Sequence, residues 1–85
     1  MTWSVGWSEK SARQLKKIDK QTAKKIIARV EEIRDDPFKA VKRLSNSILY
    51  GLRVGDYRVI LDLKSGKLII FVVSTAKRGR SYDRL

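Results

Sequence analysis

The chain has 85 residues, of which 42% are hydrophobic and 34% are charged, and this size predicts a single folded domain spanning residues 1–85. It contains no cysteine and no histidine, which excludes disulfides, thiolate or imidazole metal sites and catalysis by a serine–histidine–aspartate triad. The formal net charge is +11, which is the most informative feature of the composition.

The positive charge is unevenly distributed along the chain. Residues 39–85 hold eleven basic side chains and three acidic ones, whereas residues 1–38 hold nine and six. Such a field attracts nucleic acid, acidic proteins or anionic membranes, and its concentration in one half favours a polyanion site over a merely soluble surface. No segment resembles a signal peptide or is long enough to span a bilayer, so a cytoplasmic protein is expected.

The N-terminal segment predicts a strand followed by a helix. Residues 3–7 alternate large apolar side chains with small ones, as in a half-buried strand, and we expect both tryptophans to pack in the core or on the sheet. Ser8 is a suitable N-cap for a helix that runs to about Lys17. Ala12 and Leu15 are expected to face inward.

A second, longer helix follows, and Asp19 can cap its start. Its apolar side chains recur with the spacing of one buried face, and these are Ala23, Ile26, Ile27, Val30 and Ile33. The sequence Asp35-Asp36-Pro37 ends the helix because proline disfavours helical geometry in the residue before it. The two helices therefore predict a hairpin laid over a sheet.

Beyond an irregular stretch at residues 38–47, the chain predicts three strands joined by tight turns. The strands are expected at residues 49–54, 57–63 and 67–74, with turns at Gly55-Asp56 and Ser65-Gly66. Residues 68–73 are apolar without interruption, which is typical of a central strand buried on both faces. The order β-α-α-β-β-β indicates an α+β fold with the helical hairpin packed on a small antiparallel sheet.

The block LYGLRVGDYRVILDLKSGKLIIFVVSTAKRGRSY, from Leu49 to Tyr82, resembles the RelE/ParE toxin superfamily of type II toxin–antitoxin systems. The shared features are the pair Leu52-Arg53, a short turn, the pair Tyr57-Arg58, an apolar strand and a basic ending that reaches Tyr82. The helical hairpin and the Asp-Pro break extend the resemblance to nearly the whole chain. RelE-type toxins, with their microbial ribonuclease-type fold, are the most similar members.

The resemblance implies a metal-independent, cofactor-free endoribonuclease that cleaves messenger RNA in the ribosomal A site and so inhibits translation. Arg58 matches the arginine that clamps the scissile phosphate, Arg78 matches the catalytic arginine, and Tyr82 matches the tyrosine that follows it. Other basic side chains are expected to bind RNA or the ribosome, and these are Lys42, Arg43, Arg53, Lys77, Arg80 and Arg84.

One departure from the family pattern concerns the strand before the first turn. One branch of RelE-like enzymes carries lysines there, and the matching positions are about Leu49 and Gly51, neither of which is basic. Arg53, Lys42 and Arg43 are the candidates to supply the missing charge.

The chemistry of these side chains suits RNA cleavage without a metal. The 2′-hydroxyl attacks the phosphorus, so a catalyst must deprotonate it, stabilise the phosphorane and protonate the leaving 5′-oxygen. Arginine is always charged and can hold two phosphate oxygens. Tyr82 lies among Arg78, Arg80 and Arg84 in the sequence, and nearby cations favour its phenolate, so it is the candidate base, with stacking on a nucleobase as its alternative role.

Two alternative functions remain open for this sequence. A ParE-like toxin that inhibits DNA gyrase through protein contact shares the fold, and a basic RNA-binding module would use the arginines only to hold phosphates. Arg53 has a structural alternative, an ion pair with Asp56 or Asp62.

The expected partners are a 70S-type ribosome with its messenger RNA and a RelB-like antitoxin. The antitoxin is expected to be acidic and partly extended and to form a hetero-oligomer with the toxin. No membrane partner is expected.

Overall fold

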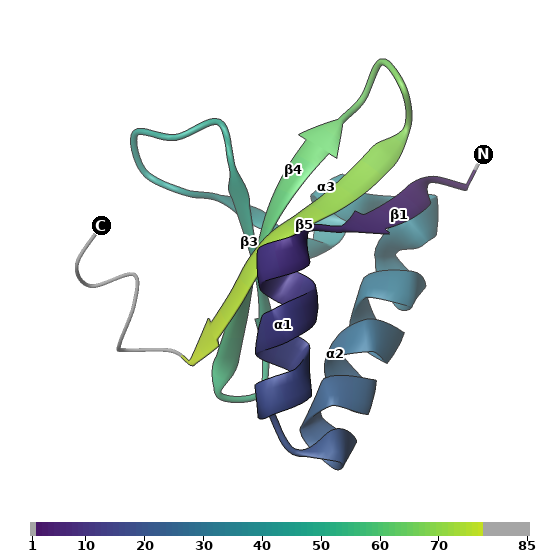
Figure 1. Cartoon of the computed structure of the whole chain (residues 1–85). Coiled ribbons are helices and arrows are strands. Elements are labelled where there is room, and N and C mark those ends of the chain that lie inside the picture. The colour runs from purple at the N-terminus through teal and green to yellow at the C-terminus, as the bar shows by residue number, and fades with distance from the viewer. Residues whose placement is uncertain (1, 78–85) are drawn as a thin grey trace.

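The computed structural model describes residues 2–77. In chain order the elements are β1 (Ser4–Trp7), α1 (Glu9–Lys17), α2 (Lys20–Glu32), the 3₁₀ helix η1 (Ile33–Asp35), α3 (Pro37–Ala40), β2 (Lys42–Arg43), β3 (Tyr50–Val54), β4 (Tyr57–Lys64) and β5 (Ile69–Lys77). The helices α1 and α2 form a hairpin that covers one face of the sheet (Figure 1). Within the described residues, no helix combines the length and the apolar character needed to span a membrane.

The five strands form one sheet in the order β1-β5-β4-β3-β2. Three of the four pairings are antiparallel, but β1 runs parallel to β5. The α+β class, the helical hairpin and the antiparallel meander of the last three strands are therefore confirmed. The sheet differs from the expected antiparallel sheet in one pair, because β1 is parallel to β5. The helical hairpin carries the chain from one edge of the sheet to the other, and β5 then inserts beside β1. The short elements α3 and β2 were not foreseen, because segments of four and two residues leave no periodic signal.

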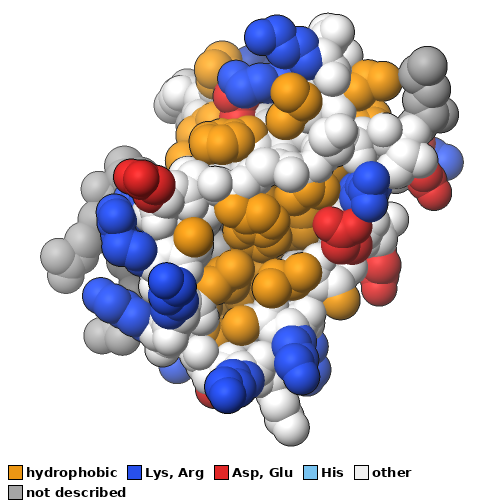
Figure 2. Space-filling model, turned by 45° about the vertical axis from the view of Figure 1, so that its right-hand side comes forward, with side chains coloured by type: hydrophobic (Ala, Val, Ile, Leu, Met, Phe, Trp, Pro, Cys, Tyr) orange, Lys and Arg blue, Asp and Glu red, His pale blue; other side chains and the backbone are white. Residues whose placement is uncertain are grey.

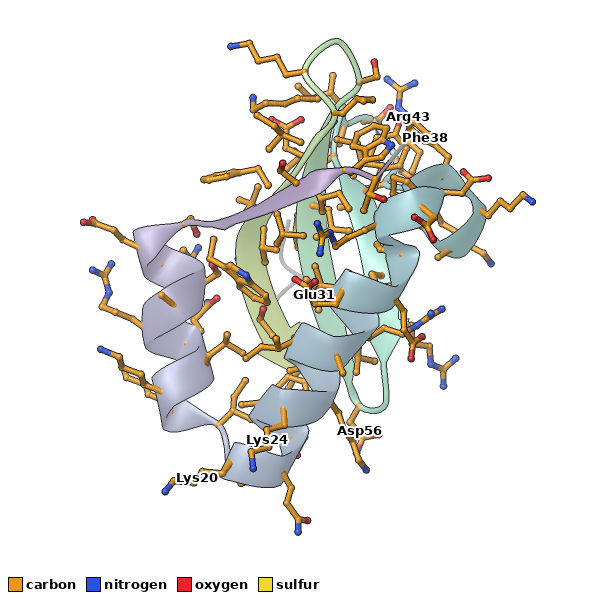
Figure 3. All side chains as sticks on the ribbon, turned by 90° about the vertical axis from the view of Figure 1, so that its right-hand side faces the viewer. Lys20, Lys24, Glu31, Phe38, Arg43 and Asp56 are labelled. Atoms are coloured by element: carbon orange, nitrogen blue, oxygen red, sulfur yellow. The ribbon has the colours of Figure 1, made fainter. Side chains whose placement is uncertain are left out.

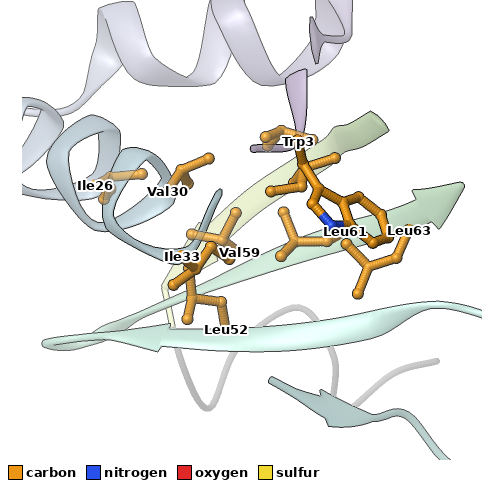
Figure 4. Packing of buried hydrophobic residues seen from close by; sticks show 10 residues of the cluster. Trp3, Ile26, Val30, Ile33, Leu52, Val59, Leu61 and Leu63 are labelled. Carbon is orange, nitrogen blue, oxygen red and sulfur yellow. The ribbon is translucent and has the colours of Figure 1, made fainter. Parts of the chain in front are cut away.

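The core lies between α2 and the sheet. Ile26 and Val30 of α2 and Ile33 of η1 are buried against Leu52 and Val59 of β3 and β4 (Figure 4). Burying a side chain of this size contributes about 1.5–3 kcal/mol. At the start of α2 the Asp19 carboxylate accepts a hydrogen bond from the backbone N–H of Thr22 at 3.1 Å, as its predicted role as an N-cap requires. Hydrogen bonds from the side chain and backbone of Thr22 lower the pKa of the Asp19 carboxyl.

Two residues expected to face inward do not. Ile27 is 42% exposed, and Ala12 is also exposed. Successive helical residues are rotated by about 100°, so the sheet reaches the stripe through Ile26 and Val30 but not Ile27. In α1 the residue that turns to the sheet is Ser11, whose hydroxyl lies 3.1 Å from the carbonyl oxygen of Val72.

The face that carries the helices is apolar at its centre. Figure 2 shows hydrophobic side chains gathered there, with Lys and Arg side chains mostly around them. Trp7, Leu15 and Ile18 are half-buried and pack against the core. The core therefore extends outward beneath α1 and is incompletely covered on this side.

Polar side chains of α1 cover the outer edge of β5. The short strand β1 pairs with only the first four residues of β5. Where β1 ends, the Ser8 backbone N–H donates to the carbonyl of Val72 at 3.0 Å, and the Ser8 hydroxyl donates to that of Val73 at 2.7 Å. Six residues further on, the Gln14 side-chain oxygen accepts from the backbone N–H of Thr75 at 2.7 Å. These bonds supply the partners that a strand would otherwise provide.

The prediction that the last strand is buried on both faces was wrong. Ile70, Val72 and Thr75 are buried, but Phe71 and Val73 between them are only half-buried. The reason is that the two helices lie on one face of the sheet and leave the other face open.

The turns lie where expected, although the second spans residues 65–68, so that β5 begins at Ile69 and not at Lys67.

We predict that Gln14→Ala lowers the free energy of unfolding by about 1–3 kcal/mol, because the buried N–H of Thr75 loses its acceptor. Chemical denaturation followed by circular dichroism measures this difference. The matched control is Gln21→Ala on the exposed surface of α2, which should change stability by no more than about 0.5 kcal/mol. Equal effects of the two substitutions would contradict the role assigned to Gln14.

Candidate nucleic-acid interface

The sheet face opposite α1 and α2 carries a hollow of about 380 Å³, here called the cationic cleft. It is formed by β2, β3 and β4 with the chain on either side of β2, and its lining residues are Ala40, Lys42, Arg43, Leu44, Ser45, Gly51, Arg53 and Arg58. Among the described residues that line it, half are basic and none is acidic. The cleft therefore has a positive field that attracts anions.

Strand register brings the two arginines of the cleft together. Arg53 and Arg58 lie directly opposite each other on β3 and β4. Their neighbours Leu52 and Val59 are buried in the core, so the two arginines point to the open face by the alternation of a strand. Lys42 lies opposite Gly51 in the β2–β3 pair and faces the same side. Like charges placed directly opposite destabilise a sheet, and an anion bound between them offsets their repulsion.

Arg43 belongs to the cleft but also supports the loop after β2. Its Nε donates to the carbonyl of Ser47 at 2.9 Å. It lies opposite Tyr50 in the register, and the Phe38 ring contacts that tyrosine with centroids 5.6 Å apart. Figure 3 shows Arg43 and Phe38 at the same end of the molecule. Arg43 thus joins the cleft to a second, shallow hollow under the loop, lined by Arg43, Leu44, Asn46, Ser47 and Ile48.

Four of the nine site residues expected from the sequence therefore line one cleft: Lys42, Arg43, Arg53 and Arg58. Lys77 does not join them. It lies opposite Tyr57, while its neighbour Ala76 lies opposite Arg58, so strand alternation turns Lys77 towards the face that bears the helices. The expected site residues Arg78, Arg80, Tyr82 and Arg84 lie outside the described residues, and their roles stay predictions.

The alternative prediction that Arg53 forms an ion pair with Asp56 or Asp62 was wrong. Asp62 pairs with Lys64 at 3.0 Å, and within residues 2–77 no carboxylate lies within ion-pair distance of Arg53.

The residues of the cleft that sequence reasoning missed are Ala40, Leu44, Ser45 and Gly51. Of these, Gly51 carried a signal, because an isolated glycine inside a strand pattern indicates a close approach of other groups.

The described lining of the cleft has donors for phosphate oxygens but no carboxylate that could accept a proton. Its described lining offers guanidinium and ammonium donors, which suit phosphate oxygens. Among residues 2–77 no group of three or more carboxylates is placed to hold a metal ion. A general base for chemistry at this cleft therefore has to come from another part of the chain or from a partner.

The sequence model of the family described as "ParE toxin of type II toxin-antitoxin system, parDE" matches residues 5–82. No curated protein sequence matches the chain significantly. The match covers the helical hairpin, the cationic cleft and the basic C-terminal ending.

Solved structures share the fold. A mutant of the E. coli toxin RelE in the free state superposes with a TM-score of 0.83 at 19% identity, covering 96% of this chain and 90% of that one. A chain of the RelBE2 toxin–antitoxin complex from Mycobacterium tuberculosis gives 0.82 at 15% identity, covering 92% of this chain and 100% of that one. A chain of the archaeal RelE–RelB complex from Pyrococcus horikoshii OT3 gives 0.81 at 24%, covering 95% and 100%. At these identities the likeness establishes a common fold.

We predict that Arg53→Ala and Arg58→Ala each weaken RNA binding and reduce its salt dependence. Loss of one phosphate contact should make the slope of log K against log salt shallower by about 0.7 on single-stranded RNA. Fluorescence anisotropy with a short labelled RNA across a salt series measures this slope. Lys24→Ala removes the same charge from α2, away from the cleft (Figure 3), and should leave the slope nearly unchanged. An equal change in all three variants would show that binding depends on net charge alone.

Proposed function

Since the chain belongs to the ParE toxin family of type II toxin–antitoxin systems, within the RelE/ParE superfamily, we propose that it is a ribosome-dependent endoribonuclease that cleaves messenger RNA in the A site and inhibits translation. The observation that carries the proposal is the pair of arginines facing each other in the cationic cleft. Together with Lys42 and Arg43 they place four cationic side chains in one hollow, and this concentration of positive charge favours a function that uses an anion.

The proposed reaction needs no metal. The 2′-oxygen bonds to the phosphorus as the bond to the 5′-oxygen breaks, which leaves a 2′,3′-cyclic phosphate and a free 5′-hydroxyl. Arg58 and Arg53 are proposed to hold the non-bridging oxygens of the scissile phosphate and to stabilise the phosphorane, with Lys42 and Arg43 binding the adjacent backbone. Fixed donors of this kind act most strongly where the charge develops, which is at these oxygens.

The remaining steps are assigned to the C-terminal residues. Tyr82 is proposed to take the proton from the 2′-hydroxyl, and Arg78 to stabilise the leaving 5′-oxygen as it is protonated. Arg78 follows Ala76 by two residues in the sequence, and Ala76 is the cross-strand neighbour of Arg58. Lys77, Arg80 and Arg84 remain proposed contacts to RNA or the ribosome.

A second candidate function is inhibition of DNA gyrase through protein contact. It is favoured by the ParE description of the matching family and by the lack of basic side chains at Leu49 and Gly51. An inhibitor of this kind does not need paired phosphate-binding arginines on an open sheet face. The cleft is therefore the feature that separates the two proposals.

The proposed partners follow from membership in a toxin–antitoxin family. The cognate antitoxin is proposed to be acidic where it crosses the sheet half, because residues 39–85 carry the larger positive excess. An extended segment buries more of a small domain than a compact partner, so partial disorder of the free antitoxin is proposed as well. We propose a toxin–antitoxin hetero-oligomer in the cytoplasm, with the 70S-type ribosome as the target of the free toxin.

We predict that the protein added to a translating bacterial lysate produces messenger-RNA fragments ending in a 2′,3′-cyclic phosphate, and that Arg58→Ala lowers the rate by about a hundredfold or more. Primer extension on ribosome-bound messenger RNA measures the cleavage. A parallel supercoiling assay with purified gyrase tests the second candidate. Intact messenger RNA together with inhibited gyrase would overturn the ribonuclease proposal.

We also predict that Tyr82→Phe slows cleavage while leaving ribosome binding unchanged. The substitution removes only the phenol oxygen, so stacking and packing persist while proton transfer does not. Cosedimentation with ribosomes and single-turnover cleavage measure the two quantities separately. Equal cleavage rates for both proteins would assign Tyr82 to stacking on a base.

A further inference from the structure

Gly51 lies inside the strand β3, where the backbone has no need of a glycine. It lies opposite Ile60 on one side and opposite Lys42 on the other, in regular antiparallel register. Among the glycines of the described chain only Gly55 has a positive φ, so Gly51 holds no left-handed conformation that other residues avoid. Glycine within a strand weakens it, because it has no side chain to pack and loses more backbone freedom on folding.

The space above Gly51 explains the glycine. A Cβ atom placed there would lie 3.2 Å from Cδ2 of Leu44, 3.6 Å from Cδ of Arg58 and 3.7 Å from Nε of Arg58. By contrast, a Cβ at Gly66 would meet no atom within 4 Å. The side chains of Arg58, from β4, and of Leu44, the residue after β2, thus converge over Gly51.

This arrangement sets the direction of Arg58. Its cross-strand partner is Arg53, yet its Cδ and Nε lie over Gly51, two residues away along β3. The side chain therefore runs diagonally across β3, towards the β2 side of the cleft. That path carries the Arg58 guanidinium towards the side of Lys42 and Leu44, which line the same cleft.

We propose that Gly51 is a positioning residue for Arg58: the missing side chain leaves the path along which Arg58 crosses β3 to reach the bound phosphate. The inference rests on the proposed function, because it assigns Arg58 to phosphate binding.

Two substitutions of different size separate this role from simple packing. Gly51→Ala adds one methyl in ordinary contact with Arg58, and Leu44 can yield by a few tenths of an ångström. Gly51→Val adds two further carbons in the path of Arg58, although valine favours strands and should not unfold β3. Gly51→Ala should bind RNA nearly as well as the parent, whereas Gly51→Val should bind roughly tenfold more weakly, comparable to loss of one charged hydrogen bond.

A double-mutant cycle with Arg58→Ala tests the inference. Affinity for a short single-stranded RNA is measured by anisotropy for the parent, Gly51→Val, Arg58→Ala and the double variant, with thermal melts to verify folding. If Gly51 acts through Arg58, Gly51→Val weakens binding in the parent and has no further effect once Arg58 is alanine. Gly51→Ser, with a single γ atom, replaces the valine variant if the latter does not fold.

The outcomes are distinct. An equal loss from Gly51→Val in both backgrounds, or no loss in either, overturns the inference while leaving the proposed function intact. An unchanged affinity for Arg58→Ala overturns the assignment of Arg58 to phosphate binding, and with it both the proposed site and the inference. We expect Gly51→Val to weaken RNA binding only when Arg58 is present, so that the cycle departs from additivity by the whole of that loss in affinity.

Discussion

The hydrogen bonds by which α1 covers the outer edge of β5 are the constraint on which the rest of the structure depends. The strand β1 is too short to pair with all of β5. The backbone of β5 beyond β1 is therefore paired with Ser8, which donates, and with the Gln14 side-chain oxygen, which accepts. An unpaired strand edge in a small domain would be costly and open to association with other chains. Because α1 is held at this edge, α2 can pack its apolar stripe on the same face of the sheet.

Coverage of one face leaves the other face for the cationic cleft. The scaffold is shared with RelE structures at low sequence identity, and a shared scaffold does not by itself specify an activity. The features of this chain that point to a function are side chains on the open face, above all Arg53 opposite Arg58 and Gly51 beneath Arg58. Both are unfavourable or neutral for a strand, and local features of that kind concentrate at functional sites.

Local patterns in the sequence predicted turns and helix caps better than they predicted which side chains are buried and which strands pair. The turn at Gly55-Asp56 and the caps at Ser8 and Asp19 depend on neighbouring residues alone, and all three occur. Periodicity gives the spacing of a buried face but not its width, so Ile27 was placed inside although it is exposed. The strand β2 has two residues and exists only through its pairing with β3, so no local signal could reveal it.

The sequence by itself determined the charge, the lack of histidine and cysteine, and the pairing of Arg53 with Arg58, because a two-residue turn fixes the register of the strands on either side of it. The tertiary structure decided which other cations join that pair. Lys42 reaches the cleft through the pairing of β2 with β3. Lys77 is turned away because the β4–β5 register shifts by one residue between Ile60 and Leu61. Side chains alternate with a period of two, so a single extra residue moves every later side chain to the opposite face, and only the paired strands show where that residue lies.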